Sequence, residues 1–462
     1  MNTADDPRIA HDPARMVHDP DLPGVDPALL GLLDSRDPAL RLEAVQGLAR
    51  MLKSGEARLP SPGRDVNNHI HTTYSFSPYT PSRAVWEALS AALATAGIMD
   101  HDTISGAREF LEAGRLLGLP VTAGAEIRVS FDGTPLAGRR INNPDQVSVA
   151  YLAFHGVPYT SIDALDRFLA PVRKARDARN REMAVRLDLL ARRFGATLDY
   201  DRDVLPVSEA AHGGSVTERH LLFALVHVLM QVIPDRAELL RQLEANLAVR
   251  PSGRVAAVLM APGNPYFDYD LLGLFKSELL PQFYLPAKAE LLPVREALAF
   301  AEKHGIIAAY PYLGDVGESV TGDKKAQHFE DHYLEELFDV LVSLGIRAVT
   351  YMPSRNSHKQ LARLRTMCRR RGFFEISGED INQPRQPFVC AAMRKPEFSG
   401  LFDAAWALIG HERLAAVNPD NGMFTDATIL RMPLLERRVT AYRQYAEQFF
   451  HRENKDRGGP EL

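Results

Sequence analysis

Cysteine is nearly absent from this chain, which has only Cys368 and Cys390 among 462 residues. Two cysteines cannot build a disulfide framework or a four-cysteine zinc site, so we expect a reducing compartment, the cytoplasm. Long apolar runs are also absent, because none approaches the roughly 18–20 residues of a membrane-spanning helix. Residues 1–20 carry acidic side chains where a signal peptide would be basic and then apolar. Neither a membrane partner nor export is therefore expected.

An excess of positive charge is lacking as well. The chain has 54 basic and 59 acidic residues, a formal net charge of −5, so no surface for a nucleic acid duplex is expected. Apolar residues make up 45% and charged residues 24%, an ordinary globular composition that excludes global disorder. At roughly 100–200 residues per domain, the length predicts two to four domains, or one barrel with large additions.

From Val66 onwards, short apolar segments alternate with helical ones. We expect strands at 66–71, 96–99, 120–124, 147–154, 305–310, 346–351 and 373–377, and helices at 81–94, 105–117, 288–303, 329–344 and 358–371. This alternation predicts an α/β domain with a mostly parallel sheet, either open or closed into a barrel. Such folds place their active sites at the carboxyl ends of the strands.

Additions flank and interrupt this domain. Residues 1–35 repeat the dipeptide Asp-Pro and are expected to form an irregular arm, followed by a helix at 37–54. A helical insertion is expected at 159–285, with helices at 161–194 and 217–233; the arginines of the first should form a solvated face. Helices should return at 399–450, around a loop at 418–425. The expected division is 1–64, 65–158, 159–285, 286–398 and 399–462.

Four of the expected strands end in imidazole or carboxylate side chains. His69 and His71 stand two positions apart on the first strand, so both can point to the same side and converge on one metal. The sets that end the other strands are Asp100-His101-Asp102, Glu126, and Asp380-Ile381-Asn382. Mixed imidazole and carboxylate ligands suit zinc, manganese or iron in a hydrolytic site.

The order His-x-His-Thr-x-x-Ser, Ile-x-Asp-His-Asp and Gly-x-Glu, with spacings of about thirty and twenty-five residues, resembles the polymerase-and-histidinol-phosphatase (PHP) family. The resemblance covers 66–130 and, more loosely, 286–385. It implies a distorted seven-stranded, TIM-like β/α barrel that holds up to three metal ions, and phosphoesterase activity in most members. The insertion resembles that of the family's nucleotide-phosphatase branch, in which an arginine-rich helix precedes a Thr/Ser-Arg-x-His-like stretch, here 217–220.

By this resemblance, His69, His71, Glu126 and Asp380 hold the first metal, Glu126 bridges to a second, and His101 belongs to a further site. Asp100 and Asp102 would orient these ligands. Three family positions carry a weaker ligand or none here, namely Tyr310, Asn382 and Ala287. The histidine expected near the fourth strand falls on Ser148 or on His155. One to two divalent ions (Zn, Mn or Fe) per chain are therefore expected.

Two polar loops follow late strands and would hang over the mouth of a barrel. Candidates for binding a phosphoryl group there are Arg128, Lys324, Lys325 and Arg355. Candidates for acid–base work are Asp100, His101, His155 and Asp315. Of the other histidines, His328 and His332 are expected to form a surface pair, and His220 and His227 to lie in a helical core.

The expected function is hydrolysis of a small phosphorylated metabolite or nucleotide by metal-activated water. One alternative is a catalytically reduced PHP barrel that binds a metal and a ligand without turnover. Another is a hydrolase of a cyclic amide or ester. A DNA polymerase role is disfavoured by the negative charge and the lack of a polymerase-sized extension. An assembly of identical copies stays open, as does the identity of the substrate.

Overall fold

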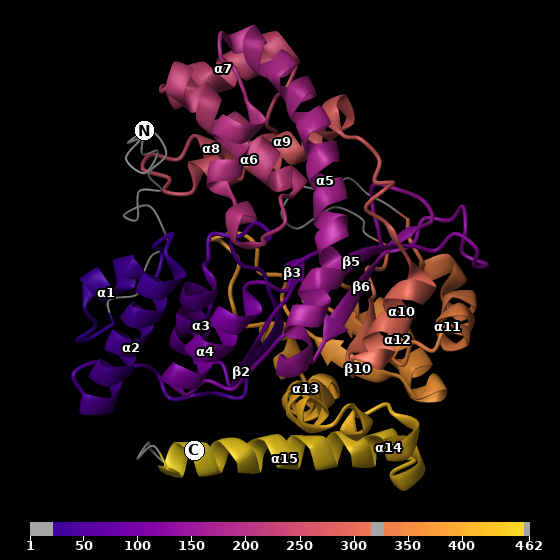
Figure 1. Cartoon of the computed structure of the whole chain (residues 1–462). Coiled ribbons are helices and arrows are strands. Elements are labelled where there is room, and N and C mark those ends of the chain that lie inside the picture. The colour runs from indigo at the N-terminus through magenta and orange to yellow at the C-terminus, as the bar shows by residue number, and fades with distance from the viewer. Residues whose placement is uncertain (1–21, 316–327, 457–462) are drawn as a thin grey trace.

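The computed structural model describes residues 22–315 and 328–456 as a mixed α/β protein. Strands occupy the centre, one group of helices stands above them and another lies below (Figure 1). The strands are β1 (Val66–Ile70), β2 (Thr95–Ile98), β3 (Asp100–His101), β4 (Val121–Thr122), β5 (Ala125–Ser130), β6 (Val149–His155), β7 (Leu292–Pro293), β8 (Ile307–Pro311), β9 (Ala348–Tyr351) and β10 (Phe374–Ser377).

The strands form two sheets, ordered β1-β2-β4 and β10-β9-β8-β6-β5-β3, with β7 beside β5. Neighbouring strands run parallel, except that β6 is antiparallel to both β5 and β8. Residues 131–148 join β5 to β6 without a helix, whereas a helix is the usual connection between parallel neighbours. The mostly parallel sheet expected from the sequence is thus confirmed, with one strand reversed.

Two strands of one sheet continue almost directly into strands of the other. Only Met99 separates β2 from β3, and only Ala123 and Gly124 separate β4 from β5. At the opposite edge, the segment after β10 bonds to β1: the amide of Ile381 donates to the carbonyl of His69 (3.1 Å), and the amide of His71 donates to the carbonyl of Ile381 (3.0 Å). The first and last strands of the sequence are therefore neighbours in space.

The amino-terminal helices are α1 (Pro27–Leu32), α2 (Pro38–Ser54), α3 (Pro81–Ser90) and α4 (Ala107–Leu117). The expectation of an irregular arm through residue 35 was wrong over α1. The side chains of Asp26 and Asp37 cap α1 and α2, and the following prolines occupy the first helical position. An aspartate accepts the free amides of a helix start, and proline fits there without losing a hydrogen bond, so these Asp-Pro pairs start helices.

The insertion consists of α5 (Ile162–Ala191), α6 (Glu218–Val232), α7 (Arg236–Leu247), α8 (Gly253–Leu259) and α9 (Phe267–Phe283). These helices share a core of their own and stand over one end of the strands (Figure 1). Exposed arginines on or just after α5 include Arg181, Arg186 and Arg192. Arg176 and Arg179, however, are buried, so the expected solvated face was wrong for these two.

The remaining helices are α10 (Val294–Lys303), α11 (Leu334–Ser343), α12 (His358–Arg371), α13 (Ser399–Val417), α14 (Asp426–Arg431) and α15 (Leu435–Asp456). Helix α13 packs beneath the strands with α15 on its outer side (Figure 1). Side chains of α13, such as Leu408, join a core that contains Ile376 of β10 and Met99. Among the described residues, no helix combines the length and the apolarity that crossing a membrane requires.

Candidate metal centre

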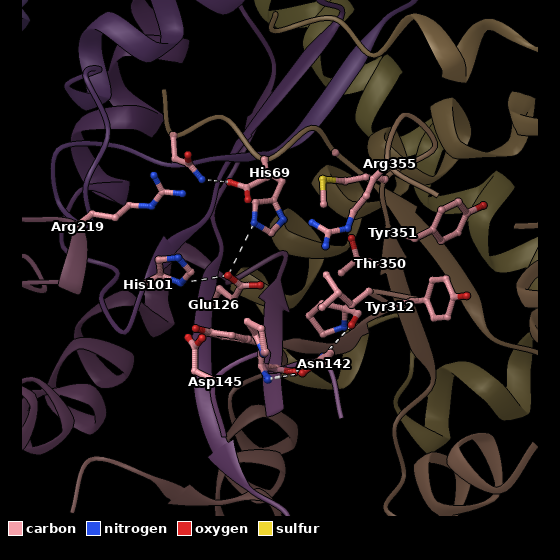
Figure 2. Close-up of a pocket in the computed structure, with 18 of the residues that line it drawn as sticks. His69, His101, Glu126, Asn142, Asp145, Arg219, Tyr312, Thr350, Tyr351 and Arg355 are labelled. Carbon is pink, nitrogen blue, oxygen red and sulfur yellow. Dashed lines mark hydrogen bonds and ion pairs between the residues drawn. The ribbon is translucent and has the colours of Figure 1, made fainter. Parts of the chain in front are cut away.

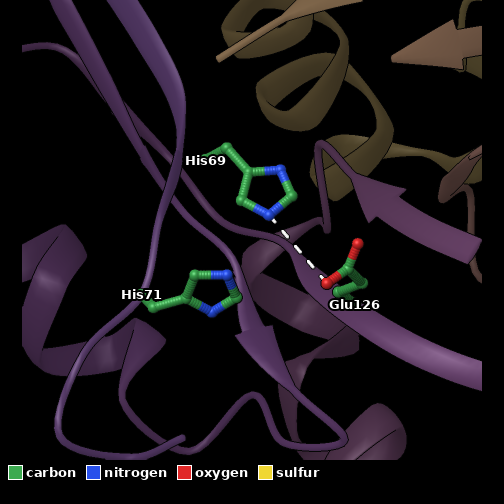
Figure 3. A group of neighbouring side chains, drawn as sticks. All are labelled: His69, His71 and Glu126. Atoms are coloured by element: carbon green, nitrogen blue, oxygen red, sulfur yellow. Dashed lines mark ion pairs between the residues drawn. The ribbon is translucent and has the colours of Figure 1, made fainter. Parts of the chain in front are cut away.

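Three of the predicted ligands meet in one buried cluster. His69 and His71 come from β1 and the residue just after it, and Glu126 from β5. One ligand atom from each lies within 4.8 Å of the other two. Figure 3 shows both imidazole rings and the carboxylate facing a common point. All three residues are at most 8% exposed. The two-residue spacing of the histidines therefore brought them together as expected.

His101 and Asp380 extend this cluster on two sides. Nδ1 of His101 lies 3.1 Å from Oε2 of Glu126, because β3 and β5 are paired with these two residues opposite each other. Nε2 of His71 lies 3.1 Å from Oδ1 of Asp380. The nitrogen atoms of both contacts are buried, and neither completes a hydrogen bond of good geometry with a described residue. The two contacts thus leave nitrogen atoms that a metal ion could engage.

Asp100 orients one of these ligands through a hydroxyl. Its carboxylate accepts hydrogen bonds from the amide and hydroxyl of Thr72 (2.7 and 2.6 Å) and from the hydroxyl of Ser75 (2.6 Å). The Ser75 oxygen in turn lies 3.3 Å from Nδ1 of His71. Since Ser75 gives its only proton to Asp100, it can only accept from His71, so Nδ1 carries the proton. The lone pair of the neutral ring is then on Nε2, which faces the cluster.

Burial and mutual charge shift the pKa of every group in the cluster. Burial lowers the pKa of His69 and holds that of His101 well below its ordinary value, so both imidazoles favour the neutral form that binds metals. Burial raises the pKa of Glu126. Burial would also raise the pKa of Asp380, but the contact with His71 outweighs it and holds the value well below the usual range. The same contact raises the pKa of His71 against the effect of burial.

A cavity of about 360 Å³ opens beside the cluster. His69, Glu126 and the ring of His101 line it, as do Asp380 and Asn382 (Figure 2). Residues from the loop before β6, from the ends of β8 and β9, and from α9 of the insertion complete the wall. The cavity therefore lies between the strand ends and the insertion.

Three cationic side chains line this cavity. Arg355 was expected there, and it lies on the opposite side of the cavity from Arg219 (Figure 2). Arg219 belongs to the 217–220 stretch, for which the sequence alone predicted no binding role, and Lys276 of α9 was not predicted. The charge of Arg219 helps to lower the pKa of Asp380, and its buried Nη1 has no hydrogen-bond partner among the described residues. The Thr-Glu-Arg-His stretch was the signal that could have singled out Arg219.

Asn382, which was predicted as a metal ligand, lines the cavity and is hydrogen-bonded to Asp380. Its Nδ2 donates to Oδ1 of Asp380 at 2.6 Å, while its buried Oδ1 has no partner among the described residues. Tyr310 points elsewhere: its hydroxyl donates to Glu330 at 3.3 Å. Ala287 is buried and its carbonyl accepts from Gln146. Among the described residues, these last two positions therefore add no ligand to the cluster.

Two acid–base candidates do not line the cavity. His155 is at the carboxyl end of the reversed strand β6, opposite Ile307 and two positions beyond Ala153, which pairs with Glu126. Burial lowers the pKa of His155 to about 3, and the charge of the nearby His69 adds to this effect. Asp315 accepts from the amide of Phe329 (2.6 Å) and contacts His328 (2.9 Å). Neither residue lines the cavity, and the same holds for Ser148, whereas Tyr151 of β6 does line it. That this strand supplies a histidine to the centre therefore stays a prediction, since His155 is near His69 but does not belong to the cavity wall.

Of the remaining residues predicted to bind a phosphoryl group, one is buried outside the cavity and two lie in a part of the chain that is not described. Arg128 is 3% exposed, and its guanidinium pairs with Glu218 (3.2 Å) and Glu290 (3.7 Å) rather than facing the cavity. Lys324 and Lys325 lie outside the described residues.

His328 and His332 are exposed as expected. His220 is buried in the insertion, while His227 is half-buried, 3.7 Å from Asp268.

The chain was compared with known proteins. No protein-family model matches it, and no curated protein matches it. One similar solved structure is a protein from Bifidobacterium adolescentis provisionally assigned as a metal-dependent phosphoesterase, at 20% identity and a TM-score of 0.47, covering 72% of this chain and 92% of the other. Another is an amidohydrolase from Chromobacterium violaceum with bound sulfate and no metal, at 18% identity and a TM-score of 0.47, covering 70% of this chain and 90% of the other.

Proposed function

We propose that this protein is a metal-dependent phosphoesterase that hydrolyses a small phosphorylated molecule. One observation carries the proposal: His69, His71 and Glu126 form a buried cluster beside a cavity whose wall also carries cationic side chains. Imidazole and carboxylate groups bind a divalent ion, and guanidinium groups suit the oxygens of a phosphoryl group. A site with both features fits a phosphorylated substrate better than a neutral amide or ester.

The residues present fit a metal ion. Three ligand atoms converge within 4.8 Å, and the nearby nitrogens of His71 and His101 lack a hydrogen-bond partner of good geometry. His69, His71, Glu126 and Asp380 would hold a first ion, and Glu126 with His101 would contribute to a second. When bound, such an ion supplies Lewis-acid polarisation and lowers the pKa of a bound water. Zinc, manganese and iron all accept this ligand set.

The residues of the chain would bind and orient the substrate around this centre. Arg219 and Arg355 approach the cavity from opposite sides (Figure 2), so a phosphoryl group between them would receive charge-assisted hydrogen bonds from both. Negative charge that grows on the phosphoryl oxygens during hydrolysis would be stabilised by the same groups, which are already in place. The insertion would therefore contribute directly to substrate binding through Arg219 and Lys276.

We also propose that the strands close into a distorted barrel of the PHP type. The near-continuity of β2 with β3 and of β4 with β5 supports this proposal, because it merges the two sheets at one side. The backbone hydrogen bonds of Ile381 with His69 and His71 support closure at the other side. A closed barrel would place β1 next to β10, where Asp380 is within reach of the histidines.

The proposal is tested by phosphate release from a panel of phosphomonoesters and nucleotides, with protein loaded with Mn, Zn or Fe and with protein treated with a chelator. We expect turnover of at least one phosphorylated compound only in the metal-loaded protein. Binding of a nucleotide without turnover would instead favour the ligand-binding module. Hydrolysis of cyclic amides or esters without phosphate release would favour the other alternative.

A further inference from the structure

We propose that Arg176, in the insertion, is a positioning residue for the metal centre and acts through Asp102. The inference rests on the proposed function, because it concerns the geometry of the proposed metal ligands. It assigns the insertion a second role, besides supplying the cavity wall: a helix outside the strands would set the relative positions of His101 and Glu126.

Asp102 ties together the two strands that carry these ligands. It directly follows His101, and its amide donates to the carbonyl of Glu126 at 2.9 Å. Its Oδ1 accepts from the amide of Arg128 at 3.2 Å, two positions after Glu126. The backbone and the side chain of Asp102 thus hold β3 against β5 at the Glu126 carbonyl and at the amide two positions later. The φ angle of Asp102 is 53°, in the left-handed region that is uncommon outside glycine. The chain therefore leaves β3 in an unusual backbone conformation.

Arg176 holds the other oxygen of this carboxylate. Its Nη1 pairs with Oδ2 of Asp102, and its Nη2 contacts Glu218 at 3.1 Å. The arginine is 4% exposed and Asp102 is 1% exposed. Removing one partner of such a buried pair leaves the other charge uncompensated, so the remaining carboxylate would seek water or another donor. Asp102 could then no longer keep its present orientation between the two strands.

Glu218 anchors the arginine from the insertion side. It also pairs with Arg128 of β5 (3.2 Å) and with Arg179 of α5 (2.7 Å), and Arg179 in turn pairs with Glu290 (2.8 Å). These buried charges form one network between α5, α6 and β5. Within it, Arg176 contacts Asp102 and Arg179 does not. The two arginines lie on the same helix, are both buried and share Glu218, so they form a matched pair for an experiment.

The experiment uses the full chain, freed of metal with a chelator, and titrates it with Mn²⁺ alone by calorimetry. Groups that orient metal ligands typically change metal affinity by about 10- to 100-fold when mutated. We expect Arg176→Met to weaken Mn²⁺ binding by a factor in that range and Arg176→Lys to restore part of the loss. Arg179→Met should lower the unfolding temperature to a similar degree but keep wild-type Mn²⁺ affinity. With Co²⁺ as the probe, the visible absorption spectrum should change in Arg176→Met and not in Arg179→Met.

The outcomes separate this inference from the proposed function. If the wild-type chain binds neither Mn²⁺ nor Co²⁺, the metal centre is refuted and the positioning role with it. If the wild type binds metal and Arg176→Met binds it equally well, or if both arginine variants lose affinity equally, the positioning role is overturned while the proposed function stands. Should Arg176→Met fail to fold, Asp102→Asn decides instead, since it removes the charge without changing the size of the side chain, and unchanged Mn²⁺ affinity in it refutes the proposal.

Discussion

His71 and Asp380 meet with 3.1 Å between Nε2 and Oδ1, although they come from opposite ends of the α/β domain. The histidine follows the first strand, and the aspartate follows β10. The Ile381 backbone joins these two segments on both sides of Ile70. Asp380 therefore reaches the candidate metal centre only when the first and last strands lie side by side.

The first prediction is that metal content depends on this pair. His71→Ala should lower bound metal from one or two ions to well below one per chain, because it removes a ligand from the centre of the cluster. Turnover should fall by more than about a hundredfold, since even residues that only orient ligands cost about 10- to 100-fold. Elemental analysis and phosphate release measure the two effects. His227→Ala, in the insertion, is the control and should retain metal; a His71→Ala, Asp380→Ala double variant with full metal occupancy would contradict the assignment.

The second prediction concerns the two arginines of the cavity. Arg219→Ala and Arg355→Ala should each lower kcat/KM for a phosphomonoester by about 10- to 150-fold, the loss of one hydrogen bond to a charged group worth about 1.5–3 kcal/mol. Metal content should not change, because neither side chain belongs to the metal ligands. Steady-state kinetics with elemental analysis checks both statements. Arg254→Ala, at an exposed site on α8, is the control, and an equal loss in all three variants would remove the special role of the cavity.

Local periodicity was enough to predict much of the site. The spacing of His69 and His71 on an alternating strand put both rings on one side, and the short strands before His101 and Glu126 predicted that their ends would meet. Direct pairing of β3 with β5 places these two residues opposite each other. Helices α2 and α12 also begin and end within a residue of the expected limits. The side of a strand on which a residue lies and the limits of a helix depend on residues close in the sequence, so the sequence alone can indicate them.

Features that depend on distant partners could not be read in the same way. Arg176 and Arg179 have the spacing of a solvated helix face, and only the fold reveals that Glu218 and Glu290 neutralise them. His155 was a candidate because the family resemblance implies a histidine near the fourth strand, with Ser148 as the alternative position. In the structure β6 is antiparallel to β5 and β8, a direction that local sequence patterns do not determine, and neither residue lines the cavity. The cavity-lining role of Arg219 depended on how the insertion stands over the strands.

The third prediction is the number of metal ions. The side chains of His69, His71 and Glu126 converge, Asp380 contacts His71, and His101 contacts Glu126. In the proposed assignment these residues supply one complete centre and part of a second. At two further positions where the family resemblance implies metal ligands, Tyr310 bonds to Glu330 and Ala287 is buried. Elemental analysis of protein purified without a chelator should therefore find one to two ions per chain. Three firmly bound ions would show that other residues, including any outside the described part of the chain, complete a third centre.

The last prediction concerns Glu330 and the pH dependence of stability. Its Oε1 accepts from the amide of Leu313 (2.8 Å) and from Tyr310 (3.3 Å), while its buried Oε2 has no partner among the described residues. Burial raises the pKa of this carboxyl group from 4.5 to about 7. Between these values the folded chain holds a proton that the unfolded chain releases.

The contribution of Glu330 to stability is therefore greatest below pH 4.5 and falls as the pH rises to 7, by up to about 1.4 kcal/mol per pH unit. Glu330→Gln cannot ionise and should remove this fall, so the variant should gain free energy of unfolding relative to the wild type from pH 5 to pH 7, with a constant difference above pH 8. Urea unfolding at several pH values measures the difference, and Glu335→Gln on the exposed side of α11 controls for loss of a surface carboxylate. A wild-type and Glu330→Gln difference that does not vary between pH 5 and pH 8 would show that Glu330 ionises at its ordinary pKa in the folded chain.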